Sequence, residues 1–376
     1  MKKIIINILM ILMILFAISF SSFAEGNFNE NNIEETTIVF EKAKVLKCED
    51  LRSVGDYQYD YQLVTVSIET GDYKGEVVEI ENVLPENIAY RIIAEEGKEV
   101  IIGIEGEGES RQIYVSDYSR NSTTKVLVLV FLALLVIVGK QKGIKSVITI
   151  SLTMFLIFKV LLPGILNGKD PLMLAIIIAS LITVLTIIIV SGFNKKSYAA
   201  IMGTIIGVVV AAIIAMIVGN VITITGLMPD EAAMLTYIPQ GISLNYNNLL
   251  FAGILLGALG AVMDVAMSIA SSIQEIYLAD KSQSRRKLFS SGMAIGHDIM
   301  GTMSNTLILA YTGSSIPLLL ILMSYQTPLS EITNMDIVAT EIVRSLAGSI
   351  GLIITIPVTA FLSVILLEID NKKKPV

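Results

Sequence analysis

Residues 171–192 read PLMLAIIIASLITVLTIIIVSG and contain no charged side chain. A helix rises about 1.5 Å per residue, so roughly 20 apolar residues cross the hydrocarbon core of a bilayer. This stretch therefore predicts a membrane-spanning helix. Six further apolar runs surround it, and the complete set of predicted spans is 123–139, 144–162, 171–192, 198–225, 249–270, 297–324 and 346–368.

The composition also points to lipid. Of the 376 residues, 53% are hydrophobic and 16% are charged, whereas soluble domains average about 25% charged residues. Because the chain has one cysteine (Cys48) and one histidine (His297), we expect neither an internal disulfide nor a metal site rich in histidine. The hydrolase, metalloprotease, P-loop and dinucleotide motifs are all absent, so we expect no enzyme activity and no cofactor.

The first 24 residues have the pattern of an export signal. Lys2 and Lys3 precede an apolar run, which ends in Ser22-Phe23-Ala24. Residues 1–24 are either a cleaved signal peptide or a signal anchor, and both predict that the following residues are exported. Residues 25–35 are rich in Asn and Glu, and we expect them to be disordered.

Residues 36–120 predict a small β domain. Short segments of alternating polar and β-branched or aromatic residues are separated by turn sequences such as Gly71-Asp72. Five short strands in such a length are typical of a small barrel of the OB or SH3-like kind. The expected strands are Thr36–Leu46, Tyr59–Glu69, Gly75–Glu81, Glu99–Ile104 and Arg111–Val115.

The charge of this β domain limits its partners. Residues 25–120 hold 22 Asp and Glu against 9 Lys and Arg, and this negative charge repels nucleic acid. We therefore expect a structural or docking barrel outside the cell, with an envelope protein as one possible partner. Nucleic acid is not an expected partner.

The positive charges predict the orientation of the spans. With the β domain outside, the inner segments 140–143, 193–197, 271–296 and 369–376 carry most of the bases, whereas the outer loops carry only Lys169 and Arg344. Lys and Arg concentrate on the cytoplasmic side of membrane proteins. The sequence thus predicts a seven-helix bundle over 123–368, in the bilayer of a cytoplasmic membrane, with a basic cytoplasmic tail at 369–376.

Two predicted spans carry acidic residues that hydrocarbon does not tolerate without compensation. Asp264 is expected about 9 Å inside the cytoplasmic end of its helix, if that helix stops near Ala270. Ser268 and Glu275 share its helix face. In the sixth predicted span, a helix capped by Ser290 or Ser291 would place Asp298, Thr302 and Asn305 on one face, beside His297.

If the two helices are neighbours, these side chains converge on one site lined by oxygen atoms. Such a lining suits protons or hard cations better than soft metals. The competing interpretation is that buried Asp, Asn and Ser only tie helices together. We interpret His297 as a hydrogen-bonding partner rather than a metal ligand, because no second His or nearby Cys is available.

Two predictions concern the last third of the chain. Residues 330–345 are typical of an amphipathic helix lying on the outer surface, where Arg344 would pair with Glu341 or face lipid headgroups. Pro317 and Pro357 fall inside predicted spans and are expected to kink them.

Three long blocks resemble the signature of YibE/F-like bacterial membrane proteins: GALGAVMDVAMSIASS at 257–272, GHDIMGTMSNTLILAY at 296–311 and VRSLAGSIGL at 343–352. The segment GDYKG at 71–75 extends the resemblance to the β domain. It implies a multi-spanning protein of the bacterial envelope, and it supplies no substrate or binding residues to carry over. His297 departs from the arginine that the resemblance leads us to expect.

Two functions remain open from the sequence. The first is a secondary transporter or channel for protons, cations or a small solute, with its site at Asp264, Ser268, Glu275, His297, Asp298, Thr302 and Asn305. The alternative is a non-transporting membrane scaffold whose exported barrel recruits an envelope partner.

Overall fold

The computed structural model describes residues 38–49, 52–54, 59–106, 108, 111–228, 230–238, 241 and 243–368. These residues divide into two compact units, with the boundary between Leu134 and Leu135. The expected signal (1–24), the expected disordered segment (25–35) and the expected basic tail (369–376) lie outside the described residues.

The first unit contains an antiparallel sheet. Its strands are β1 Ile38–Cys48, β2 Arg52–Val54, β3 Tyr59–Ile68, β4 Val77–Leu84, β5 Glu99–Glu105 and β6 Gln112–Tyr118. The hydrogen-bonded order is β4-β3-β1-β5-β6, and β2 pairs with the start of β3 beyond the end of β1. The five expected strands are therefore confirmed, whereas the three-residue β2 was not predicted.

The sheet curls into a half barrel around its apolar face. Alternate residues of β4 point inward, as the period of two requires, and one of them, Ile80, joins Val64, Val66, Val100 and Ile102 in one buried cluster. Strands β4 and β6 contact each other without pairing among the described residues. The buried amide of Gln62 exchanges two hydrogen bonds of 2.9 Å with the backbone of Ala94, which holds a connecting segment against this core.

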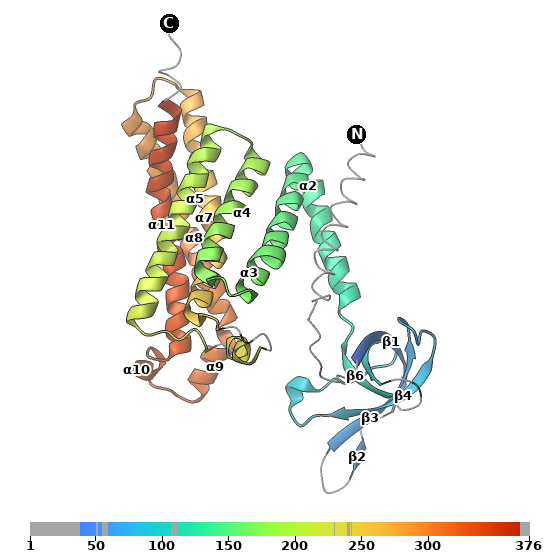
Figure 1. Cartoon of the computed structure of the whole chain (residues 1–376). Helices are drawn as coiled ribbons and strands as arrows, with labels where there is room; N and C mark the ends of the chain where they lie inside the picture. Colours follow the sequence, from blue (N-terminus) through green and yellow to red (C-terminus); the bar gives the residue numbers. More distant parts are fainter. Residues whose placement is uncertain are drawn as a thin grey trace. The chain divides into compact units, whose positions relative to one another are not determined.

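The second unit is helical (Figure 1). Helix α2 runs from Asn121 to Leu156, so its residues 121–134 belong to the first unit. It continues through a π-helical turn, Ile157–Leu161, into the short α3. The remaining helices are α3 Leu162–Leu166, α4 Pro171–Ser191, α5 Lys195–Val221, α6 Asp230–Met234, α7 Tyr246–Ala279, α8 Arg285–Ser314, α9 Ile316–Ser324, α10 Leu329–Ile332 and α11 Asp336–Glu368.

Five described helices are long and apolar enough to cross a membrane, or six if α8 and α9 form one broken span. The bend of 59° between α8 and α9 confirms the kink expected near Pro317, whereas α11 continues through Pro357 as one helix. Helix α2 contains a second break at Lys140, where the backbone is non-helical (φ 50°, ψ −124°) and two helices meet. All seven predicted apolar runs lie largely within these helices, while the number of crossings stays a prediction.

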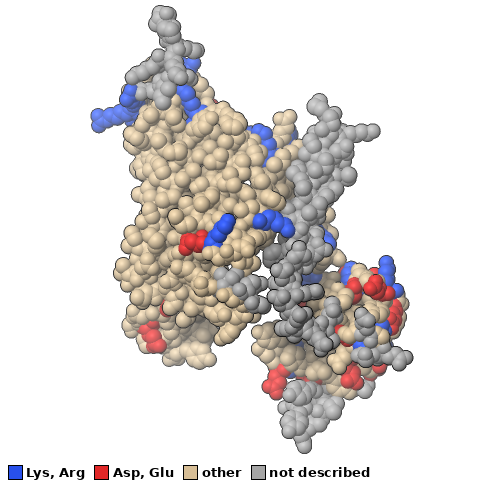
Figure 2. Space-filling model, in the orientation of Figure 1, with Lys and Arg blue, Asp and Glu red and all other residues tan. Residues whose placement is uncertain are grey.

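Helices α4, α5, α7, α8 and α11 have two common ends. At one end, which we call the Asp336 end, the Asp336 carboxylate accepts a 2.6 Å hydrogen bond from Thr225, and Asn248 donates to Asp170. At the opposite end, which we call the Ser284 end, Tyr277, Arg285 and Leu367 line one small pocket. On the face of the helical unit in Figure 2, Lys and Arg gather at the end that holds the C-terminus, and most of the surface between the ends is uncharged.

Three predicted boundaries were wrong. Helix α7 continues to Ala279 instead of stopping near Ala270. Helix α8 begins at Arg285, with Ser284 as its cap, rather than near Ser290. Residues 330–345 do not form a separate surface helix, because most of them belong to α11. In each case the helix continues through polar residues, whereas the predicted boundaries follow the ends of the apolar runs.

The tightest packing in the helical unit lies between α5 and α11. A Cβ on Gly203 would overlap the Thr359 hydroxyl, and a Cβ on Gly207 would overlap the Thr355 hydroxyl and lie 2.9 Å from a backbone oxygen of Gly351. Small residues let helix backbones approach closely in a membrane. This contact fixes α11 beside α5, α7 and α8 and so positions the candidate site.

Candidate functional site

All seven residues predicted for the site lie on α7 or α8. Asp264, Ser268 and Glu275 are on α7, and the other four are on α8: His297, Asp298, Thr302 and Asn305. All seven are exposed on the helical unit. On α7 they continue a line of exposed glycines that includes Gly253 and Gly260. Ionisable side chains thus occupy the solvent-accessible face of two otherwise apolar helices.

Helices α7 and α8 are antiparallel neighbours. The hydroxyl oxygen of Tyr311 lies 2.6 Å from the point that a Cβ on Gly257 would occupy. Nearer the Ser284 end, Gly292 faces Ile273 of α7, whereas Gly296 faces Ile356 of α11 and has Ile269 of α7 at ordinary contact distance. Gly257 and Gly292 each admit a large side chain from the other helix, which fixes the register between α7 and α8.

This register gives the relative depth of the acidic residues. Asp264 follows Gly257 by seven residues, and Ser304 precedes Tyr311 by seven, so both lie about 10 Å closer to the Ser284 end than the Gly257–Tyr311 contact. The contact of Gly292 with Ile273 places Asp298 at the level of Met267, about 4.5 Å further in the same direction. Because the two helices are neighbours and the two acidic residues lie within about one turn of each other along the axis, the convergence of Asp264 and Asp298 on one site stays a prediction.

Sequence reasoning gave no site role to a second polar cluster, formed by Tyr311, Glu341 and Arg344. The Arg344 Nη1 atom lies 2.8 Å from Glu341 Oε1, so the expected pairing of these two residues is confirmed. The Arg344 guanidinium also lies 6.0 Å from the centre of the Tyr311 ring. Arg344 and Glu341 are respectively 26% and 23% exposed, and both are within α11 rather than on a surface helix.

Several polar atoms around this cluster are buried and lack a hydrogen-bond partner in the described part of the chain. They are the second carboxylate oxygen of Glu341, the hydroxyl of Tyr311 and the hydroxyl of Ser304. A buried polar group without a partner is costly, and such groups call for a bound water, ion or ligand. The spacing of three residues between Glu341 and Arg344 indicated that they share one helix face. It did not indicate that this face is mostly buried, because residues 330–345 were expected to lie on the outer surface.

The ionisable groups form a line along α7, α8 and α11, which we call the polar ladder. Gly348 of α11 faces Ala258, so Arg344 lies one turn nearer the Asp336 end, close to the level of Tyr311. Asp264 follows about 10 Å from the Tyr311 hydroxyl, His297 and Asp298 lie about 4.5 Å beyond Asp264, and Glu275 lies roughly 12 Å beyond those. The ladder is thus nearly as long as the hydrocarbon core is thick, which is about 30 Å.

A metal site does not emerge from these positions. Among the residues that the structure describes, no group of three or more His, Cys, Asp or Glu side chains is close enough together to hold a metal ion. The intervals within the polar ladder explain this result, because direct ligands to a cation lie within about 2.6 Å of it.

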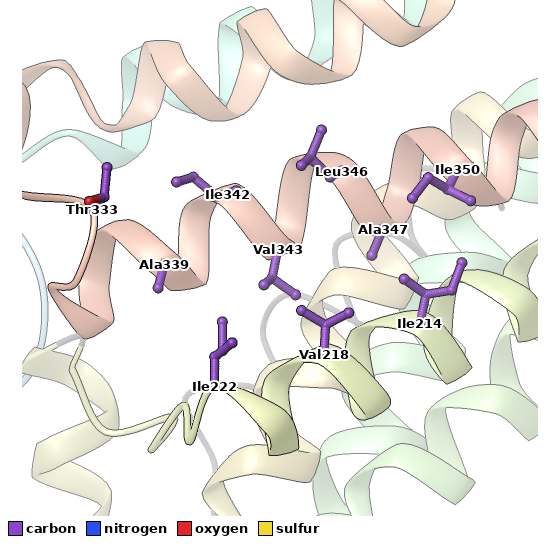
Figure 3. Close-up of a pocket in the computed structure, with 10 residues that line it drawn as sticks. All are labelled: Ile214, Val218, Ile222, Thr333, Ala339, Ile342, Val343, Leu346, Ala347 and Ile350. Carbon is purple, nitrogen blue, oxygen red and sulfur yellow. The ribbon is translucent and has the colours of Figure 1, made fainter. Parts of the chain in front are cut away.

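An apolar groove of the helical unit lies away from the ladder, between α5 and α11 (Figure 3). Its volume is about 280 Å³, and Val218 of α5 and Ile222, which caps α5, point across it toward Val343 of α11. Thr333 is the one polar residue among those that line it. This groove suits an apolar chain and offers nothing to an ion.

A comparison with known families decides what these helices belong to. A model of the YibE/F-like protein family matches residues 127–369, which is more than half of the chain. The chain belongs to the YibE/F-like family. The polar ladder lies entirely within the YibE/F-like region, whereas the half barrel precedes it. No curated protein and no solved structure matches the chain.

Proposed function

We propose that this YibE/F-like protein crosses a bacterial cytoplasmic membrane seven times, with the half barrel outside and the C-terminus in the cytoplasm. The break at Lys140 would divide residues 121–166 into two crossings, which brings the count to seven. The basic residues at the Ser284 end support a cytoplasmic location for that end. The curved six-stranded antiparallel sheet of the exported domain supports an OB or SH3-like barrel.

The proposed activity is the movement of protons, cations or a small solute along the polar ladder. The observation that carries this proposal is the succession of ionisable groups on α7, α8 and α11, which extends over roughly 27 Å along the helix axes. Charged residues within spans are costly and mark ion pathways more often than they mark packing contacts. Asp264 occupies the central position, between the Tyr311 cluster and Asp298.

The test is a flux measurement with the full-length protein in liposomes. Protons, sodium, potassium and magnesium are screened one at a time, and Asp264→Asn is compared with Asp280→Asn. Asp280 is the matched control because it is an exposed carboxylate at the end of α7. We expect Asp264→Asn to lower the flux at least about tenfold, since a positioned proton-transfer group contributes that much or more.

For this comparison to count, both variants must insert and elute from size exclusion like the wild type. Wild-type flux in the Asp264→Asn protein would remove the polar ladder from the transport mechanism.

A scaffold function is the second candidate, and the half barrel favours it. Val78, Glu79, Gly108, Arg111 and Ile113 line an open groove on this domain, with Arg111 held by Glu76 and stacked 4.5 Å from the Tyr73 ring. A mixed polar and apolar groove of this kind fits a protein partner. In this case deletion of residues 25–120 should abolish co-purification of an envelope protein, and Asp264→Asn should change stability only. Neither candidate requires enzyme chemistry.

A further inference from the structure

We propose that Tyr311, Glu341 and Arg344 form a proton-binding station at the Asp336 end of the polar ladder, and that the proton is the ion that the ladder carries. This inference rests on the proposed transport function and names its substrate. It begins from the two buried oxygen atoms of this cluster that have no partner in the described residues, Glu341 Oε2 and the Tyr311 hydroxyl.

The two oxygen atoms have complementary needs. An ionised carboxylate oxygen accepts hydrogen bonds, whereas a phenol hydroxyl both donates and accepts. One water molecule satisfies both groups by donating to Glu341 and accepting from Tyr311, and buried waters commonly bridge polar groups in this way. The cluster is therefore suited to bind a water molecule beside the Glu341 carboxylate, and proton uptake requires such an arrangement.

Arg344 is a positioning residue in this arrangement. Its guanidinium binds the first oxygen of Glu341 at 2.8 Å and stacks toward the Tyr311 ring, so it orients the second oxygen and leaves it free. A hydronium ion transfers its proton to Glu341 Oε2, which becomes a neutral carboxylic acid and releases water. The acid then returns the proton to a water on the side of Ser304 and Asp264.

The surroundings contain few groups that compete for this proton. On α8 the titratable group that faces Glu341 is Tyr311, and on α11 it is Arg344. Because Gly348 faces Ala258, the nearest carboxylate of α7, Asp264, lies about 20 Å from Glu341 along the helix axes. The titratable residues of α5 are Lys195, Lys196 and Tyr198, all at its opposite end.

The spacing of the ladder favours a proton over a metal cation. A dehydrated cation needs several oxygen ligands at about 2–2.6 Å simultaneously. The Glu341 carboxylate lies about 20 Å from Asp264 along the helix axes, and the described residues contain no group of three or more acidic, His or Cys side chains that could form such a shell. A proton needs only one carboxylate at a time, with water and hydroxyl groups in between. The unpartnered hydroxyl of Ser304, at the level of Asp264, is placed to order such a water.

The experiment follows proton entry into liposomes that contain the full-length protein and a pH-sensitive dye, driven by a potassium gradient with valinomycin. Glu341→Gln and Tyr311→Phe are compared with Asp264→Asn and with Glu331→Gln, an exposed glutamate in the neighbouring α10. Size exclusion of each variant reports folding. Tyr311→Phe keeps the ring and its packing, so it carries the test if Glu341→Gln does not fold.

We expect Glu341→Gln and Tyr311→Phe to lower proton entry about tenfold or more, with Glu331→Gln unchanged. Wild-type proton entry in both variants, together with its loss in Asp264→Asn, would overturn the station and leave transport standing. An Asp264-dependent flux of another ion without protons would overturn the substrate assignment. A wild-type protein without any Asp264-dependent flux would overturn the proposed function, and the station with it.

Discussion

At the scale of single residues, the half barrel contains an ion-pair network that links two of its strands. Lys42 on β1 lies 2.9 Å from Glu99 on β5 and 3.5 Å from Glu69. The hydrogen bond from Lys42 lowers the pKa of Glu99, and the same bond raises the pKa of Lys42. Because these side chains are solvent-accessible, the effect on stability is small, although its pH dependence has a definite sign.

A carboxylate whose pKa is lowered in the folded state stabilises that state above its unfolded pKa, and this contribution disappears as the pH falls through the folded value. Glu99→Gln should therefore speed amide hydrogen exchange in β1 and β5 at pH 7 and have no effect near pH 3. Exchange is measured by mass spectrometry on the full chain, always against wild type at the same pH. Glu81→Gln, an exposed glutamate on β4, is the control. An equal effect of Glu99→Gln at both pH values would contradict the ion-pair explanation.

At the scale of elements, the α5–α11 contact depends on glycine. Gly207→Ala should destabilise the protein by about 1–3 kcal/mol, as overpacking of a filled interface does, because the new Cβ meets the Thr355 hydroxyl and the backbone of Gly351. Gly253→Ala is the matched substitution, since a Cβ there meets nothing within 4 Å. The readout is the temperature at which the detergent-solubilised protein loses its size-exclusion peak. Equal temperatures for the two variants would show that the contact is not tight.

The elements also show which features were predictable from the sequence. Apolar periodicity and length located every long helix and five strands, because burial in lipid or in a sheet imposes those patterns directly. Helix ends were missed where polar segments continue a helix, as after Ala270 in α7 and before Leu346 in α11. The faces of Asp264 and Asp298 follow from helical spacing, but their relative depth depends on the register that Gly257 and Gly292 set with the opposite helix. No spacing within one helix encodes that register.

At the scale of the whole molecule, the distribution of bases makes a prediction about sidedness. In a Cys48→Ser background, Ser282→Cys tests the loop between α7 and α8, and Glu331→Cys tests α10. We expect a membrane-impermeant thiol reagent to label Glu331→Cys in intact cells and Ser282→Cys only after permeabilisation. Labelling of both positions from outside would contradict the proposed orientation.

The central claim is that water reaches the ladder face of α7 and α8 within the membrane. The most direct measurement compares rates of modification by an impermeant, water-dependent thiol reagent at Ser268→Cys and Thr302→Cys with the rate at Ile213→Cys. Ile213 is the control because it lies in the interior of α5 and its side chain is exposed on the apolar surface of that helix. Rates at the two ladder positions at least about tenfold above that at Ile213→Cys are predicted, since a hydrated thiol ionises and one in lipid does not. Equally slow modification at all three positions would show that the ladder is dry and would contradict transport along it.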